Sequence, residues 1–183
     1  MGKNSRPDTM ITDYVTGREV PNVGAEENRQ VVEKFLVEEK GYPKEGLQVD
    51  VDIAITVAGE PYRSQVDLVV SADGGKTRFM VVRCAAGSLG SREREIVAAA
   101  RLLDEYQIPW TVVSDGKTAV VLDTVSGKKI GDGLAAIPSK QEATARLKSY
   151  TPPALPAERR EREKLIFRTY DVENVNVPRN LSS

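Results

Sequence analysis

The chain has 183 residues, of which 40% are apolar, and this is enough for one domain with a hydrophobic core and short tails. Its 26 basic and 27 acidic residues leave a formal charge of −1, which gives no global field to hold nucleic acid. Histidine is absent, and this excludes histidine-based acid–base catalysis, Ser-His-Asp triads and the commonest zinc sites.

The first elements are predicted from apolar periodicity. Residues 1–23 are polar without a sustained period, and we expect them to form an N-terminal lead-in. Apolar residues at helical spacing predict a helix over residues 26–40, which Gly41 ends. Strict alternation of apolar and polar residues over 47–57 then predicts a strand with one buried face.

The middle of the chain predicts the rest of a sheet. Short apolar runs between turn residues indicate four more strands, at 64–71, 77–84, 108–114 and 118–123. An apolar stripe predicts a helix over 91–106, between the third and fourth of the five strands. The order αβββαββ therefore predicts an α/β (α+β) fold with a mixed five-stranded sheet flanked by helices.

The C-terminal part is expected to be helical. Ser139 and Glu142 have capping-box spacing and predict a helix that runs to about Tyr150. Three prolines in 151–156 predict a linker, and a charged helix follows over 158–167. Because its arginines alternate with glutamates, we interpret this helix as solvated rather than as a DNA contact. The expected divisions are residues 1–23, 24–150 and 151–183.

Three short patterns superficially suggest nucleotide binding. Gly75-Lys76-Thr77 and Gly116-Lys117-Thr118 resemble the end of a P-loop, but the first glycine of that motif is missing from both. Gly131-Asp132-Gly133 resembles part of a dinucleotide fingerprint, but Pro138 follows too soon for the required helix. We interpret all three as turns.

Several motifs together resemble the N-terminal nuclease domain of type I restriction enzyme R subunits. The resemblance covers roughly residues 24–125, and its order and spacing carry more weight than any single motif. The matching residues are Glu26, Arg29-Gln30, Gly41-Tyr42-Pro43, Val66-Asp67-Leu68-Val69-Val70 and Ser114-Asp115-Gly116. The resemblance implies a PD-(D/E)xK restriction-endonuclease-like core, in which an Asp on one strand and a Glu-x-Lys on the next hold and use Mg²⁺.

The chain departs from this family pattern at the catalytic positions. Asp67 matches the family's Asp, but Arg83 replaces its Glu and Ala85 replaces its Lys. The helix over 91–106 also lacks the glutamine that many relatives place there. We therefore expect no catalytic residues, only a relic site of Glu26, Asp67, Arg83 and Ala85. In that site Arg83 should pair with Asp67 across neighbouring strands and exclude a metal ion.

Three functional hypotheses follow. The first is a non-catalytic binding or assembly module that uses no cofactor and engages DNA or a protein partner. The second is an active Mg²⁺-dependent DNA endonuclease, with Asp67, Glu26 and Glu60 as metal ligands. In the third, Asp67 is an ordinary polar strand residue of a structural domain, and the C-terminal arm forms a homo-oligomer.

The single cysteine bears on the compartment and on the core. Cys84 has no partner within the chain, which is typical of a reducing compartment, and we expect a cytoplasmic protein. No run of 18 apolar residues and no leader is readable, so no membrane association is expected. Cys84 should face away from Arg83 and Ala85, as a small core residue.

Overall fold

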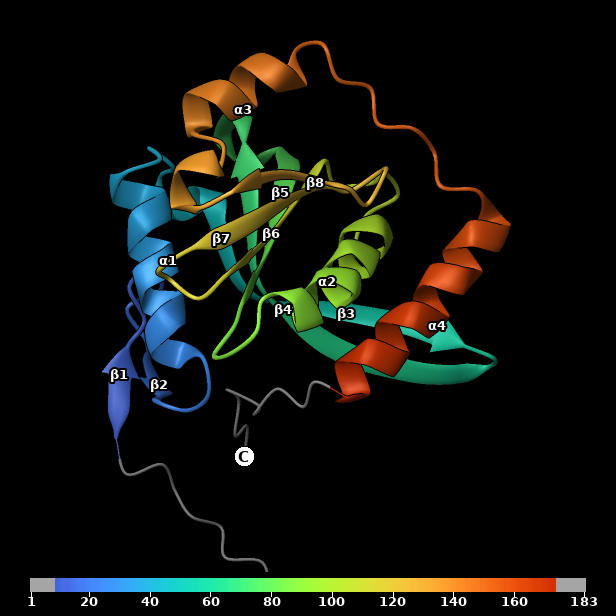
Figure 1. Ribbon diagram of the computed structural model, residues 1–183, viewed down its shortest axis with the longest axis horizontal. Coiled ribbons are helices and arrows are strands. Elements are labelled where there is room, and N and C mark those ends of the chain that lie inside the picture. The colour runs from blue at the N-terminus through green and yellow to red at the C-terminus, as the bar shows by residue number, and fades with distance from the viewer. Residues whose placement is uncertain (1–8, 174–183) are drawn as a thin grey trace, which may run out of the picture.

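The computed structural model describes residues 9–173 and shows a mixed α/β fold (Figure 1). Its centre is a six-stranded sheet in the order β3-β4-β5-β6-β7-β8. The strands are β3 (Leu47–Val57), β4 (Glu60–Ala72), β5 (Thr77–Cys84), β6 (Trp110–Ser114), β7 (Ala119–Asp123) and β8 (Lys129–Asp132). Neighbouring strands are antiparallel except β5 and β6, which are parallel, so the predicted mixed sheet is confirmed.

The prediction of five strands was wrong by one. β8 pairs with β7 at the edge of the sheet, and it is short and mostly exposed. Its sequence, Lys129-Ile130-Gly131-Asp132, has one apolar side chain and no alternation, so it carries no signal of a half-buried strand. Gly131 is required there because a Cβ at this position would lie 2.7 Å from the Cβ of Ala136.

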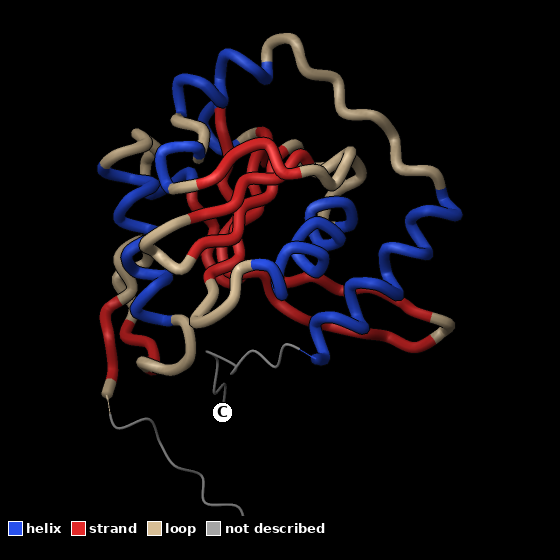
Figure 2. Tube along the Cα trace, viewed as in Figure 1, coloured by secondary structure: helices blue, strands red, loops and turns tan. Residues whose placement is uncertain are grey.

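Two helices cover opposite faces of the sheet (Figure 2). α1 (Glu26–Glu38) packs through Val32 and Leu36 on the face that includes Val82 and Cys84. α2 (Gly90–Leu102) connects the parallel strands β5 and β6, and packs on the face that includes Val81 and Ala85. Residues 82 and 84 therefore point to one side of β5 and residues 81 and 85 to the other, as strand geometry requires.

β3 is interrupted at Asp50. The alternation over 47–57 predicts a regular strand, but Asp50 has φ 54° and its place in the ladder with β4 is skipped. Asp tolerates this left-handed conformation better than most residues. The irregularity lies beside Asp67 and turns the Asp50 carboxylate toward α1, where it contacts Arg29.

The expected lead-in contains ordered structure between residues 10 and 21. β1 (Met10–Thr12) and β2 (Glu19–Pro21) form a two-stranded antiparallel sheet. The connection between them is fixed to α1, because the backbone N–H of Tyr14 donates to Gln30 Oε1 at 2.6 Å. Strands of three residues are too short to show a period in the sequence.

The C-terminal helices complete the two faces. α3 (Lys140–Leu147) begins with the predicted capping box, in which Ser139 and Glu142 bond each other's backbone N–H groups at 3.1 Å. α4 (Ala157–Glu173) is longer than predicted and is not solvated all round. Its Glu163, Phe167 and Asp171 are buried, and Phe167 joins the core on the α2 face. Among residues 9–173, no helix has both the length and the apolar character needed to span a membrane.

Candidate functional site

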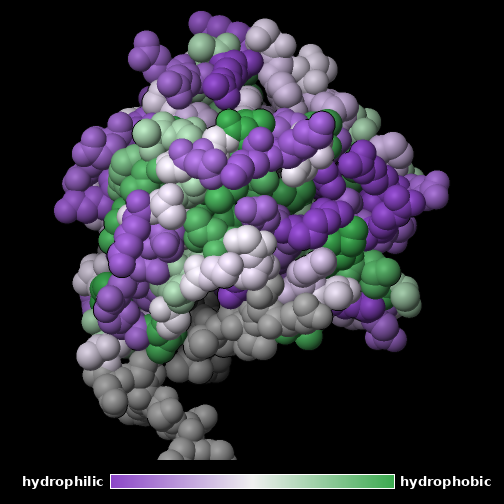
Figure 3. All heavy atoms as spheres, viewed as in Figure 1, coloured by the Kyte–Doolittle hydropathy of each residue, from purple (hydrophilic) through white to green (hydrophobic). Residues whose placement is uncertain are grey.

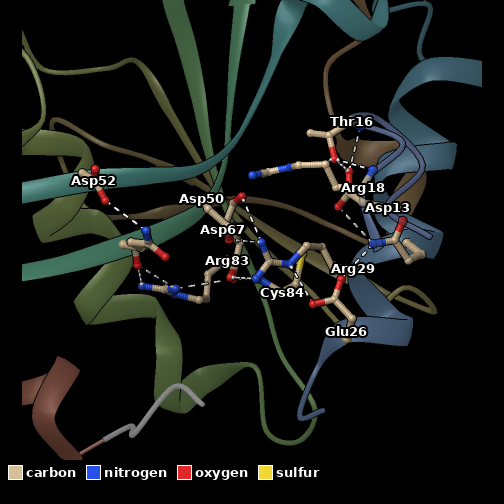
Figure 4. A network of polar contacts seen from close by, with 12 residues as sticks. Asp13, Thr16, Arg18, Glu26, Arg29, Asp50, Asp52, Asp67, Arg83 and Cys84 are labelled. Carbon is tan, nitrogen blue, oxygen red and sulfur yellow. Dashed lines mark hydrogen bonds and ion pairs between the residues drawn. The ribbon is translucent and has the colours of Figure 1, made fainter. Parts of the chain in front are cut away.

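The candidate site lies where β4 and β5 run side by side between α1 and α2 (Figure 4). Leu68 of β4 pairs with Val82 of β5, so the antiparallel register places Asp67 next to Arg83. α1 approaches this point from one face and α2 from the other. With Asp50 of β3, the fold brings together polar side chains from five elements inside the protein.

Arg83 lies at the centre of a buried network. Its side chain is 1% exposed, and its Nη1 lies 3.4 Å from Asp67 Oδ2, which confirms the predicted pair. Arg83 also contacts Glu95 on α2, and this carboxylate is closer, with Oε1 2.5 Å from Arg83 Nη2. Both terminal nitrogens also donate to the backbone carbonyl of Gln65 at 3.3 Å.

Asp67 has a second and closer cation. Arg29 of α1 places Nη2 2.7 Å from Asp67 Oδ1 and Nη1 2.6 Å from Asp50 Oδ1. The other oxygen of Asp67 accepts the backbone N–H of Cys84 at 2.7 Å. Two guanidinium groups and one backbone donor therefore surround a single carboxylate.

The network shifts the ionisation of its members. The buried site by itself lowers the pKa of Arg83, but Asp67 and Glu95 outweigh this effect, and the net pKa is raised, so Arg83 is charged. Burial raises the pKa of Glu95, and Arg83 opposes that shift. Burial also raises the pKa of the Cys84 thiol, which packs in the core and is no activated nucleophile.

The other residues predicted for the site have different positions. Glu26 is buried on α1, where it accepts from Gln30 Nε2 at 2.8 Å and lies 4.0 Å from Arg29 Nε. Ala85 lies in the apolar cluster under α2. Glu60 is exposed at the far end of β4, about seven residues or roughly 23 Å along the strand from Asp67. The structure therefore brings Glu26, Asp67 and Arg83 together and leaves Glu60 outside.

Three members of the network were missed as functional residues. Arg29 matches the family motif without a predicted contact, and Asp50 is one of the polar residues in the alternation over 47–57. Glu95 is completely buried in the part of α2 that α4 covers. A charged residue on a helix is usually exposed, and no pattern in the sequence indicates that another helix covers this one. The one available signal was the arginine at position 83, which requires a buried counter-charge.

These side chains do not fit a divalent metal ion. Mg²⁺ requires oxygen ligands that face a common point. One oxygen of Asp50, both oxygens of Asp67 and one oxygen of Glu95 instead lie 2.5–3.4 Å from guanidinium nitrogens of Arg29 or Arg83. Within residues 9–173, no group of three or more Asp, Glu or Cys side chains is arranged to hold a metal ion.

Comparison with known protein families gives a match that covers most of the chain. The family model described as type I restriction enzyme R protein N terminus matches residues 24–138, which include both strands of the site and both helices that cover it. The chain matches no curated protein and no solved structure at a significant level.

Proposed function

Because the chain belongs to the family of type I restriction enzyme R protein N termini, we propose that it is a restriction-endonuclease-like domain without nuclease activity. In this proposal it serves as a binding or assembly module for DNA or for a protein partner, and it needs no metal cofactor. The observation that carries the proposal is the buried guanidinium of Arg83 between Asp67 and Glu95.

The electrostatics of the site support the loss of metal chemistry. The motif of related nucleases has a Glu where Arg83 lies, so the substitution replaces a ligand charge by a cation. A divalent cation next to Arg83 and Arg29 would be repelled by both, and the repulsion is strong where water is excluded. Moving Arg83 away would remove the nearest cation of the buried Glu95, which is costly.

The order of the elements supports a PD-(D/E)xK core. α1 precedes the antiparallel strands β3, β4 and β5, and α2 then crosses over to β6, which is parallel to β5. The match to the family model spans this whole unit. A fold and its chemistry are separable, so the scaffold retains a use in binding after its active site has changed.

A cleavage assay tests the proposal. Wild-type protein and the D67N variant are incubated with plasmid DNA in Mg²⁺ or Mn²⁺, and we expect equal and negligible cleavage from both. The matched control is D52N, which changes an exposed Asp on β3. Metal-dependent cleavage that is lost in D67N and kept in D52N would refute the proposal.

The double variant R83E/A85K tests the reason for inactivity. It rebuilds the Glu-x-Lys motif on β5 and removes one of the two cations beside Asp67. The triple variant R29Q/R83E/A85K removes the other cation as well. We expect this triple variant to bind Mg²⁺, as measured by calorimetry. If the triple variant is folded by circular dichroism and binds no Mg²⁺, then Arg83 and Arg29 are not what keeps the metal out.

A further inference from the structure

A polar cavity lies away from Asp67, between α2, α4 and the turn that joins β7 to β8. Its volume is about 430 Å³. Its lining includes Arg94, Arg101, Arg159, Ser126 and Gly127, and it includes none of Asp67, Arg83 and Glu95. Hydrophilic side chains gather over this region, on the right of the molecule in Figure 3. Three arginines thus converge on one cavity.

Arg101 forms the rigid base of the cavity. Its side chain is 4% exposed, and its Nη1 lies 2.7 Å from Glu163 Oε1. Its Nε and Nη2 donate to the carbonyls of Thr124 and Val125 at 2.9 and 3.2 Å. The guanidinium fits because Gly127 has no side chain, since a Cβ there would lie 3.3 Å from Arg101 Nη2.

The other two arginines are accessible. The side chain of Arg94 is 39% exposed and donates to both oxygens of Glu163, at 3.2 and 3.1 Å. Arg159, at the start of α4, is exposed and forms no ion pair with any residue between 9 and 173. The cavity therefore has one free cation and one that is only partly covered.

The charges beside the cavity are not balanced. Three arginines face two acidic side chains, Glu93 in the lining and the buried Glu163. Burial lowers the pKa of Arg101, Glu163 opposes the shift, and Arg159 and Arg94 lower it further. Since like charges crowd here, an anion that enters the cavity relieves repulsion as well as gaining hydrogen bonds.

We propose that this cavity binds a phosphate group, held by Arg159 and Arg94 above the fixed guanidinium of Arg101. Planar guanidinium groups match tetrahedral oxyanions with paired N–H donors, and phosphate accepts from several of them at once. The cavity volume is within the usual range for small-molecule sites, so it accepts a phosphate together with the sugar attached to it. The phosphate can belong to a nucleotide or to a nucleic-acid backbone. The inference does not depend on the inactivity proposed for the Asp67 site.

The test is a titration of the intact chain at constant ionic strength, followed by amide NMR shifts of Ser126 and Gly127. The probes are inorganic phosphate, AMP and a short DNA duplex, with chloride as the reference anion. Arg159→Gln removes the free cation without breaking an ion pair, and Arg162→Gln is the control, an exposed arginine on the same helix outside the cavity. We expect Arg159→Gln to weaken phosphate binding roughly tenfold, the effect of one charged hydrogen bond, and Arg162→Gln to leave it within about twofold.

The outcomes separate the sources of the phosphate. Saturable shifts with AMP and not with the duplex assign the cavity to nucleotides, and tighter binding of the duplex assigns it to a nucleic-acid backbone. Either result supports the proposal if Arg159→Gln weakens the binding. No saturable shift at Ser126 and Gly127 with any probe, or equal binding by Arg159→Gln and wild type, would show that the arginines only fix α4 to α2.

Discussion

At the scale of single residues, Arg83 takes the place of the family's Glu, and its buried charge is met by the carboxylates of Asp67 and Glu95. The pair with Asp67 was predictable, because strand register fixes which side chains of β4 and β5 are adjacent. The contact of Arg83 with Glu95 and the contact of Asp67 with Arg29 were not predictable, because they depend on how α2 and α1 pack on the sheet. Periodicity shows which face of a helix is buried but not which residue of another element it meets.

Removing Arg83 should destabilise the protein in a pH-dependent way. Arg83→Met leaves Glu95 buried without its nearest cation, so we expect a loss of about 3–5 kcal/mol at pH 8. The pKa of Glu95 is already raised from 4.5, and it rises further without Arg83. A carboxyl whose pKa is raised in the folded state contributes its full stability at pH values below its pKa in the unfolded state. This contribution is lost as the pH rises through the pKa of the folded state. The loss in the variant should therefore be smaller at pH 5 than at pH 8.

Urea unfolding at the two pH values measures this difference. The control is Arg63→Met, an exposed arginine on β4, which should change the stability by less than about 0.5 kcal/mol at either pH. The further variant R83M/E95Q should recover most of the loss at pH 8, because it removes the uncompensated charge. Equal losses at pH 5 and pH 8 for Arg83→Met would mean that Glu95 does not titrate in this range.

At the scale of elements, the sequence predicts the helices and strands that bury an apolar face. It does not predict the packing of a helix that is held by ion pairs. The long strand β3 and the helices α1 and α2 have clear periods. α4 does not, because its buried face carries Glu163 and Asp171 together with Phe167. An ion pair across two helices leaves no hydrophobic period, so a helix held this way looks solvated in the sequence.

Removing Glu163 should therefore loosen α4. Glu163→Ala leaves Arg101 buried without a counter-charge, and we expect a loss of about 3–5 kcal/mol. Amide hydrogen exchange in α4 should become faster than in the strands of the sheet. The matched control is Glu161→Ala on the same helix, whose side chain is 64% exposed and pairs with the nearby Lys164. If the two variants exchange alike, the α2–α4 contact does not depend on Glu163.

At the scale of the whole molecule, the two core clusters share one sheet. Leu68 lies in the cluster under α1 and Ile96 in the cluster under α2, and both are fully buried. Val82 and Cys84 of β5 belong to the first cluster and Val81 to the second, so neither cluster persists without the strand that also forms the other. Composition could not show that α4, which lies in the expected linker and tail over residues 151–183, adds Phe167 to the second cluster.

The shared sheet predicts a single unfolding transition. Leu68→Ala and Ile96→Ala should each cost about 2–5 kcal/mol. Unfolding is followed by the fluorescence of Trp110, the single tryptophan, and by far-UV circular dichroism. In each variant the unfolding midpoint should shift by the same amount in both signals. A variant in which the two signals separate would show that the two faces of the sheet unfold independently.

The contact between Arg101 and Glu163 has a consequence for synthesis of the chain. The two residues are 62 positions apart, and all the strands from β6 to β8 lie between them. At roughly 5–20 residues per second, a ribosome makes α4 about 3–12 s after α2. During that interval Arg101 has no carboxylate partner, and the apolar surface that Phe167 later covers is open to water. The face under α2 is therefore finished late in translation, whereas the apolar cluster under α1 is built from residues that precede α4.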